Sequence, residues 1–328
     1  MTHCPICEAE KSKLLLNWKT YAIHKCATCK LIFTTPLPSD KELQDFYQGF
    51  MFNKPEFWEI KKAIVKKKKE LIALFNIDQN TDHSNKKILD YGGGTGIAYK
   101  AMCELGLDTY YQDLDENAIS FTQTNFGLPK KKTIRSLDET NIKFDYIFSD
   151  NVIEHVKEPI AFTKALSNNL AEGGVLVIKT PHASNTEILF NPIISINGYF
   201  LGALKYNSLF KSLQACMNRF WHSDPPRHLY SFSALSLIKL AQQMNLKNIH
   251  PAVAYYKIPI FENTITKQFF SKDKRLSGIK SVLIRVLLLP ILPIEFLLQL
   301  SKELLLFLKI LTPGGIILRL TKEQSSLN

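Results

Sequence analysis

Short runs of β-branched and aromatic residues alternate with stretches of helical periodicity between residues 85 and 260. The clearest runs read KKILDY, LDTYYQD, FDYIFSD and GGVLVIK. Polar or glycine residues bound each run, and a helical pattern separates it from the next. This alternation is typical of a parallel sheet whose strands are joined by crossover helices. The pattern therefore predicts an α/β domain in this part of the chain.

Residues 36–84 follow a helical pattern of another kind. Five apolar residues recur at roughly helical spacing, namely Ile60, Ile64, Leu71, Leu74 and Phe75. The lysines of IKKAIVKKKKELIALF lie mainly between them, so one face is expected to pack and the other to meet solvent. A nucleic-acid surface is the alternative, but a solvated helix face explains the lysines without a ligand.

Residues 287–311, LLLPILPIEFLLQLSKELLLFLKIL, form a very apolar segment. A membrane-spanning helix needs about 18 or more apolar residues with few charges. Charged residues and prolines interrupt this part of the chain: Arg285, Pro290, Pro293, Glu295, Lys302, Glu303 and Lys309. We therefore expect residues 276–312 to form a hydrophobic helical hairpin that contacts a membrane surface without crossing it. A helical pair buried on the core or in a homodimer interface is the alternative.

The charge balance supports an anionic partner. The chain of 328 residues has 41 lysines and arginines against 30 aspartates and glutamates, a net charge of +11. Such an excess attracts lipid headgroups, nucleic acid or phosphorylated substrates. The start, MTHCPICEAE, has no apolar stretch behind a basic region, so no signal peptide is expected. These features predict a cytoplasmic protein, peripheral at the cytoplasmic face of the membrane.

Four of the six cysteines form two C-x-x-C pairs near the start of the chain. Cys4 and Cys7 form one pair, Cys26 and Cys29 the other, and residues 8–25 separate them. Two such knuckles supply the four thiolates of a closed, tetrahedral zinc site. Two chance pairs of free thiols are the alternative. The spacing predicts a structural Zn²⁺ in a ribbon formed by residues 1–35.

The stretch KKILDYGGGTGIAYKAMCELG predicts a ligand-binding turn. An apolar strand leads to Asp90, where a turn begins; Gly92, Gly94 and Gly96 follow, and a helix is expected from about Ile97. A strand, a glycine turn and a helix N-terminus together form a site for a nucleotide-like ligand. The spacing is D-x-G-x-G-x-G and differs from the G-x-G-x-x-G of dinucleotide-binding proteins.

The glycine stretch resembles motif I of class I S-adenosylmethionine-dependent methyltransferases, which is close to ILDVGCGTG. The resemblance implies that Asp90, Gly92, Gly94 and Gly96 lie along S-adenosylmethionine. It also places Asp113, at the end of LDTYYQD, where a carboxylate accepts from both ribose hydroxyls. Asp115 fits better as the cap of the following helix. The adenine contact stays unassigned.

The stretch FDYIFSDNVIEHVKEP resembles the fourth strand of that family and the loop after it. Asp150, Glu154 and His155 then lie at the carboxyl end of the strand, where ligands bind in an open α/β sheet. In similar ubiquinone-pathway O-methyltransferases an E-x-x-E-H run at this position binds a divalent metal. Here the run is NVIEH, and Asn151 in place of the first glutamate weakens that implication.

Other segments extend the resemblance. EGGVLVIKTPH resembles the fifth strand, and GGIILRLTK the last, antiparallel strand. HKCATCKLIFTTPLPSDKELQDFY resembles the zinc-binding start of bacterial methyltransferases related to sugar C-methyltransferases.

The expected fold is α/β, a Rossmann-like class I methyltransferase sheet with helices on both faces. Its parts are a zinc ribbon (1–35), a helical lead-in (36–84), a methyltransferase domain (85–275) with a substrate insertion (183–230), the hydrophobic hairpin (276–312) and a final strand and tail (313–328).

Methyl transfer needs an acceptor held in line with the methyl group, and a base where the acceptor must lose a proton. The candidate histidines are His155, His182, His222 and His228. We favour His155, by its place in the resemblance, and His228, because the prolines of WHSDPPRHLYSF fix the backbone beside it. Structural roles are the alternatives: a histidine that bonds the cofactor loop, and a rigid lead-in to a helix capped by Ser233.

The function expected from these features is methyl transfer from S-adenosylmethionine to a small-molecule, glycan or lipid-linked acceptor, such as a lipid-linked glycan, at the membrane surface. An RNA methyltransferase is one alternative, argued from the zinc ribbon and the charge. No stretch interleaves exposed aromatic and basic residues as a strand-binding platform would, so nucleic acid is disfavoured as a partner. A non-catalytic scaffold that keeps the fold is the other alternative. Homodimerisation is left open.

Overall fold

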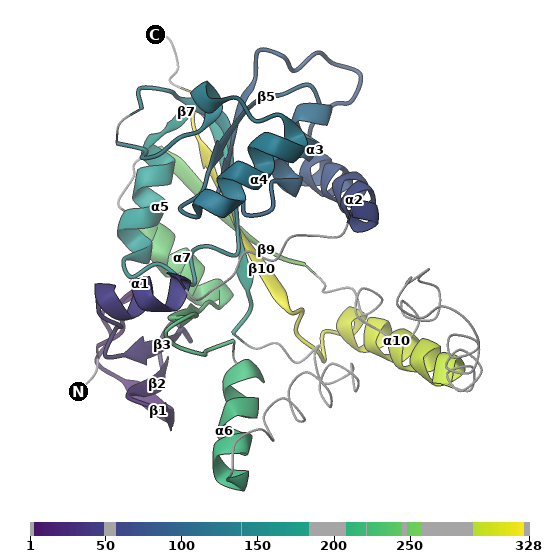
Figure 1. Cartoon of the computed structure of the whole chain (residues 1–328). Helices are drawn as coiled ribbons and strands as arrows, with labels where there is room; N and C mark the ends of the chain where they lie inside the picture. The colour runs from purple at the N-terminus through teal and green to yellow at the C-terminus, as the bar shows by residue number, and fades with distance from the viewer. Residues whose placement is uncertain are drawn as a thin grey trace.

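The computed structural model describes residues 3–48, 57–138, 140–183, 208–220, 222–244, 248–256 and 291–324. A six-stranded sheet in the order β5-β4-β6-β7-β10-β9 forms its centre (Figure 1). The strands are β4 (Lys87–Tyr91), β5 (Asp108–Gln112), β6 (Phe144–Asp150), β7 (Leu170–Pro181), β9 (Ile249–Tyr256) and β10 (Gly315–Lys322). Strands β5, β4, β6 and β7 pair in parallel, and β10 is antiparallel to both β7 and β9. The prediction of a parallel sheet closed by a last antiparallel strand is confirmed.

Helices cover both faces of this sheet, because successive side chains of each strand point to opposite sides. Ile88 and Phe148 pack toward α2 (Phe57–Phe75), α3 (Ile97–Glu104) and α4 (Glu116–Phe126). Leu89 and Ile147 belong to the core shared with α5 (Pro159–Asn168) and α7 (Ala234–Gln243). Both faces of the parallel strands are therefore buried under helices, which explains why the sequence shows nearly continuous apolar runs there.

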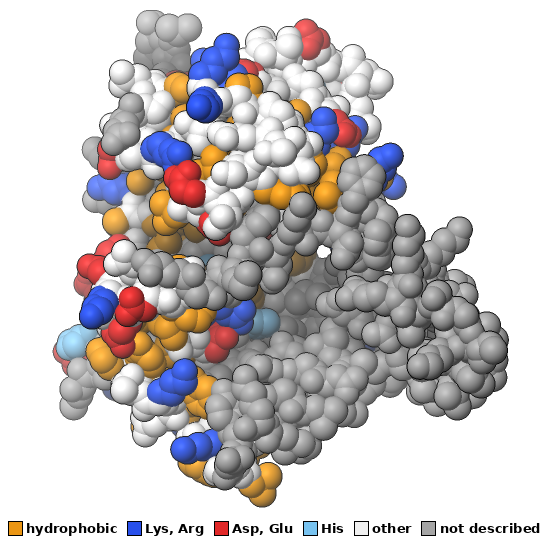
Figure 2. All heavy atoms as spheres, in the orientation of Figure 1, with side chains coloured by type: hydrophobic (Ala, Val, Ile, Leu, Met, Phe, Trp, Pro, Cys, Tyr) orange, Lys and Arg blue, Asp and Glu red, His pale blue; other side chains and the backbone are white. Residues whose placement is uncertain are grey.

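Helix α2 packs its apolar stripe as expected, with Ile60, Ile64, Leu71 and Phe75 buried. Most of the lysines on this helix meet solvent, but Lys67 is an exception because its Nζ lies 2.9 Å from Asp150 Oδ2 at the end of β6. Figure 2 shows lysine and arginine side chains of one face in small separate groups, mixed with acidic and apolar ones. A continuous basic stripe for a nucleic-acid strand is not seen among the described residues of that face.

The amino-terminal part forms a small antiparallel sheet of β1 (Ser12–Trp18), β2 (Tyr21–Cys26) and β3 (Ile32–Thr35). A fourth strand comes from far along the chain, since β8 (Tyr230–Ser231) pairs with β3. Helix α1 (Asp40–Gln48) follows the small sheet. The ribbon is thus joined to the second half of the chain by main-chain hydrogen bonds, which no local pattern had indicated.

The expected hydrophobic hairpin lies partly outside the described residues, which resume at 291. Helix α10 (Ile291–Phe307) follows, with Pro293 in its first turn, and the chain then enters β10. No helix among the described residues combines the length and the apolar character needed to cross a bilayer. Figure 1 shows α10 projecting away from the central sheet, and α6 (Leu209–Phe220) projecting beside the small sheet.

Candidate functional site

The glycine loop leaves the carboxyl end of β4 and enters α3. Asp90, buried in the strand, accepts a hydrogen bond from the backbone N–H of Tyr99 at 2.8 Å and so fixes the helix start. Gly92 has a φ of +70°, and a Cβ there would meet the Val152 side chain at 2.4 Å. At Gly94, φ is +50° and no atom lies within 4 Å of the Cβ position. The loop is therefore packed on one side and open at Gly94.

Asp113 lies immediately beyond β5 and faces this loop. Its Oδ2 accepts from the Gly94 N–H at 2.7 Å, and its Oδ1 accepts from the Asp115 N–H at 2.8 Å. Burial raises the pKa of the Asp113 carboxyl. Each oxygen keeps a further lone-pair site, which the two hydroxyls of a ribose could occupy. Asp115 accepts from the Asn117 N–H at 2.8 Å and caps α4 as predicted, while ribose binding by Asp113 stays a prediction.

Two histidines from distant segments meet beside the loop after β6. The ring centroids of His155 and His228 lie 4.8 Å apart. His155 Nδ1 lies 2.8 Å from the Arg227 carbonyl oxygen and 3.3 Å from the Tyr47 hydroxyl. Because a carbonyl can only accept, Nδ1 carries the proton and Nε2 of neutral His155 is left as the basic nitrogen. Burial and the nearby His228 lower the pKa of His155 to about 4, so it is neutral at physiological pH.

Asp224 holds the other histidine in place. Its Oδ1 lies 2.5 Å from His228 Nδ1, and its Oδ2 accepts from Arg227 Nη2 at 2.7 Å. Burial opposes ionisation of Asp224, but His228 and Arg227 outweigh it and lower the pKa of the carboxyl. A carboxylate on Nδ1 leaves Nε2 of His228 as the nitrogen that can exchange a proton with a ligand. His222, with its ring centroid 6.5 Å from that of His228, flanks the pair.

Glu154 is the third member of the histidine cluster. It is 1% exposed, and its Oε2 accepts from the Thr180 hydroxyl at 3.0 Å. Its Oε1 lies 4.0 Å from His155 Nε2 and has no hydrogen-bond partner among the described residues. Burial raises the pKa of Glu154 to about 8, so the carboxyl is mostly protonated at neutral pH. Ligand atoms of Glu154, His155 and His228 lie within 4.8 Å of one another.

The raised pKa of Glu154 predicts a pH-dependent stability. A carboxyl whose folded pKa is raised contributes stability that is present at low pH and is lost as the pH rises from about 4.5 towards 8. Glu154→Gln, which mimics the protonated side chain, should therefore gain stability relative to the wild type between pH 6 and pH 8. Melting temperatures of both proteins at these two pH values test this. If the melting temperatures of the two proteins differ by the same amount at pH 6 and at pH 8, the folded protein holds Glu154 ionised at both pH values.

Asp150 lies in a partly buried network of charges at the end of β6. Its Oδ2 accepts from Lys67 Nζ at 2.9 Å and from Lys179 Nζ at 3.1 Å, and Glu70 contacts both lysines. Burial opposes its ionisation, but the two lysines outweigh it and lower the pKa of Asp150. Next to it, Asn151 has a φ of +57°. The predicted contact of Asp150 with a cofactor stays a prediction, and the structure assigns the carboxylate two lysine partners.

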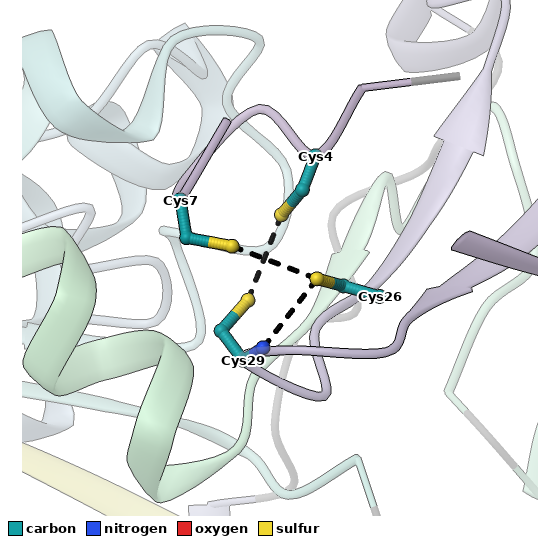
Figure 3. A group of neighbouring side chains, drawn as sticks. All are labelled: Cys4, Cys7, Cys26 and Cys29. Atoms are coloured by element: carbon teal, nitrogen blue, oxygen red, sulfur yellow. Dashed lines mark hydrogen bonds between the residues drawn. The ribbon is translucent and has the colours of Figure 1, made fainter. Parts of the chain in front are cut away.

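The four paired cysteines converge on one point (Figure 3). Cys4 Sγ lies 3.6 Å from Cys29 Sγ, and Cys7 Sγ lies 3.5 Å from Cys26 Sγ. Tetrahedral zinc with Zn–S bonds of about 2.3 Å places its sulfurs about 3.8 Å apart, close to these separations. Each C-x-x-C pair contributes one sulfur to either contact, so the two knuckles enclose a single centre. The arrangement fits the predicted S4 metal site.

His155 and His228 are candidates from the sequence, and their catalytic role stays a prediction. The groups that hold them are not among those candidates. Asp224 and Tyr47 contact His228 and His155, and Lys67 and Lys179 contact Asp150. A signal existed for Asp224, since an acidic residue precedes the Pro-Pro-Arg-His run by one position. For Tyr47 and Lys67 the sequence gives none.

The sheet order, the antiparallel last strand and the glycine loop with Asp113 define a class I methyltransferase fold. A family model described as a methyltransferase domain matches residues 59–251, more than half of the chain, and the chain belongs to this family. Ubiquinone biosynthesis O-methyltransferase of Bartonella quintana (strain Toulouse) is 30% identical over 102 residues, which are 29% of this chain and 41% of the relative. The enzyme of the same name from Brucella anthropi is 27% identical over 121 residues, 34% of this chain and 49% of that one.

The chain thus spans about half, or less, of the length of these curated relatives. Among solved structures, a SAM-dependent methyltransferase from Archaeoglobus fulgidus is similar with a TM-score of 0.43 and 12% identity, over 81% of this chain and 100% of the other. The plantazolicin methyltransferase BamL, in complex with a triazolic desmethylPZN analog and SAH, has a TM-score of 0.44 and 13% identity, over 88% and 92% of the two chains.

Proposed function

We propose that the chain transfers a methyl group from S-adenosylmethionine to a hydroxyl oxygen of a small-molecule or lipid-linked acceptor. One observation carries this proposal: the glycine loop is in contact with the loop after β6, which carries His155. Gly92 packs against Val152, and the backbone N–H of His155 donates to the Val152 carbonyl at 2.9 Å. A ligand that follows the open side of the loop from Asp113 therefore extends towards His155 and His228. The curated relatives are also named as O-methyltransferases.

The cofactor, when bound, supplies an electrophilic methyl group on a sulfonium. Asp113 would accept from the ribose hydroxyls, and the open position at Gly94 would leave room for the ribose. His228 Nε2 takes the proton of the acceptor hydroxyl, and Asp224 on Nδ1 stabilises the resulting imidazolium. S-adenosylmethionine, when bound, would give its methyl group to the acceptor oxygen, with S-adenosylhomocysteine as the leaving group. His155, neutral because of burial, limits the positive charge around the acceptor.

A divalent metal is the second role for the same cluster. Two histidines and one glutamate, with Glu154 Oε1 unpartnered among the described residues, resemble a 2-His-1-carboxylate set of ligands. Transfer activity that a chelator abolishes and added Mg²⁺ or Mn²⁺ restores would assign the cluster to a metal. Activity that the chelator lowers and that added Zn²⁺ restores, with no effect of Mg²⁺ or Mn²⁺, supports the base and a zinc confined to the ribbon.

The four cysteines would hold one structural Zn²⁺. Their sulfurs provide all four ligands of a closed site, so no position is left for substrate. The Zn²⁺ would make no bond to substrate, and the histidine cluster carries the chemistry.

Helix α10 supports a membrane location for the acceptor. Leu297, Leu300, Leu304 and Phe307 are each more than half exposed, and their spacing of three or four residues aligns them on one face. An apolar stripe on a chain of net charge +11 suits the surface of an anionic bilayer, where apolar burial and charge attraction add. An acceptor with a lipid anchor would be presented at that surface, on the cytoplasmic side.

Flotation with phosphatidylglycerol-containing liposomes tests the membrane contact. The wild type should float, and the double variant Leu300→Glu/Leu304→Glu should stay at the bottom of the gradient. The matched control is Leu209→Glu/Leu213→Glu, which adds the same charges to exposed positions of α6 and should float. A wild type that stays at the bottom and elutes as a dimer would assign the α10 stripe to a homodimer interface.

Cofactor binding is tested at Asp113, the residue that follows β5. Asp113→Ala should weaken the affinity for S-adenosylhomocysteine about tenfold to a hundredfold, because a hydrogen bond to a charged group contributes about 1.5–3 kcal/mol. Asp115→Ala is the control, since it removes a nearby carboxylate that only caps α4. Calorimetric titration measures both. Equal affinities of the two variants would place the ribose elsewhere.

A further inference from the structure

The segment that carries His228 is part of the same small sheet as the cysteine ribbon. Strand β8 begins two residues after His228, and Tyr230 and Ser231 pair with Phe33 and Ile32 of β3. The Thr34 N–H also donates to the Leu229 carbonyl at 3.0 Å. The main chain next to His228 is therefore held by the ribbon.

A side-chain bond joins the same segment to a cysteine knuckle directly. Ser233, the N-cap of α7, donates its hydroxyl hydrogen to the Cys29 carbonyl oxygen at 2.6 Å. Both residues are buried, and Cys29 contributes one of the four converging sulfurs. Cys26, Cys29 and Tyr230 also belong to one continuous apolar core. Movement of the knuckle would therefore be transmitted to the start of α7 and to β8.

On its other side, the segment that carries His228 is hydrogen-bonded to the loop after β6, which carries His155. The N–H groups of Leu229 and Tyr230 donate to the Glu154 carbonyl at 2.8 and 3.3 Å. The Arg227 carbonyl accepts from His155 Nδ1 at 2.8 Å. Residues 227–233 thus lie between the ribbon and the loop after β6, with hydrogen bonds to both. The separation of the two histidines depends on where this segment is held.

We propose that the cysteine ribbon is a positioning element for the transfer site, which sets His228 against His155 through β8 and Ser233. This inference rests on the proposed role of His228 as the base. A bound metal would fix the two knuckles, because an S4 shell adds binding free energy that holds the four cysteine side chains at one point. Without the metal the knuckle carrying Cys29 loosens, the β3–β8 pairing weakens, and His228 loses its fixed distance from His155. The glycine loop, bonded to Asp113 and α3, is unaffected.

The link is tested with a variant that leaves all four cysteines intact. Ser233→Ala removes the bond to Cys29 and one half of the α7 capping box. Ser236→Ala removes the other half of the capping box and keeps the bond to Cys29, so it is the matched control. In the zinc-loaded full chain, amide hydrogen exchange of residues 227–233 should rise at least about tenfold in Ser233→Ala, more than in the control. The imidazole resonances of His228 should shift only in Ser233→Ala.

Metal removal provides the second arm of the test. In the chelated wild type, exchange should rise both in residues 12–35 and in residues 227–233, while the affinity for S-adenosylhomocysteine changes less than about twofold. A ribbon that loses protection while residues 227–233 keep theirs would overturn the inference, and so would equal behaviour of the two serine variants. The outcome is independent of the proposed reaction, because a chain that fails to bind S-adenosylhomocysteine at all would still report the coupling.

Discussion

Replacing His228 by alanine is expected to lower the turnover number for methyl transfer by about two to four orders of magnitude. The physical reason is the loss of the Nε2 atom that takes the acceptor proton, since Asp224 occupies the opposite ring nitrogen at 2.5 Å. Affinity for S-adenosylhomocysteine should stay within about twofold, because the hydrogen bonds that hold the glycine loop and Asp113 do not involve His228. Transfer of label from methyl-labelled S-adenosylmethionine to one acceptor preparation measures the turnover.

Two further variants separate base catalysis from general damage. Asp224→Asn keeps the size of the side chain and removes the charge that stabilises the imidazolium, so it should cost about tenfold or more. His250→Ala changes an exposed histidine on β9 and should have no effect. Full turnover in His228→Ala would remove this residue from the mechanism and leave His155 as the candidate.

Replacing Cys26 by serine is expected to destabilise the amino-terminal sheet and to release the metal. Metal analysis should give about one zinc per wild-type chain and much less in the variant. Structural zinc in small domains contributes on the order of 10 kcal/mol of folding free energy, so β1, β2 and β3 should lose protection against hydrogen exchange. The matched control is Cys103→Ser, which changes a cysteine of α3 outside the cluster and should keep both metal and ribbon. Metal-free wild type with an unchanged melting curve would rule out a zinc-dependent ribbon.

Several local features of the fold could be predicted from sequence because short segments encode them. The turn after β4, the start of α3 near Ile97 and the cap at Ser233 depend on residues within a few positions of each other. The final antiparallel strand was equally accessible, since Gly315–Lys322 has a strand pattern after the apolar segment. In each case the side-chain chemistry favours one backbone conformation.

Contacts across the sheet could not be predicted in this way. Lys66 and Lys67 are adjacent and chemically identical, yet only Lys67 faces the end of β6 and pairs with Asp150. The two-residue strand β8 is too short for any periodicity to reveal, and its partner β3 lies about 200 residues earlier. The pairing of His155 with His228 is also tertiary, because each histidine was identified within its own motif.

A structure of the chain co-crystallised with S-adenosylhomocysteine tests the proposed activity most directly. The ligand is predicted to lie along the open side of the glycine loop, with its ribose hydroxyls donating to the Asp113 carboxylate. Its sulfur should point into the space beside His155 and His228, where a methyl group would meet the acceptor. At saturating ligand, a glycine loop with nothing bound, or a sulfur directed away from both histidines, would contradict the assignment of this site to methyl transfer.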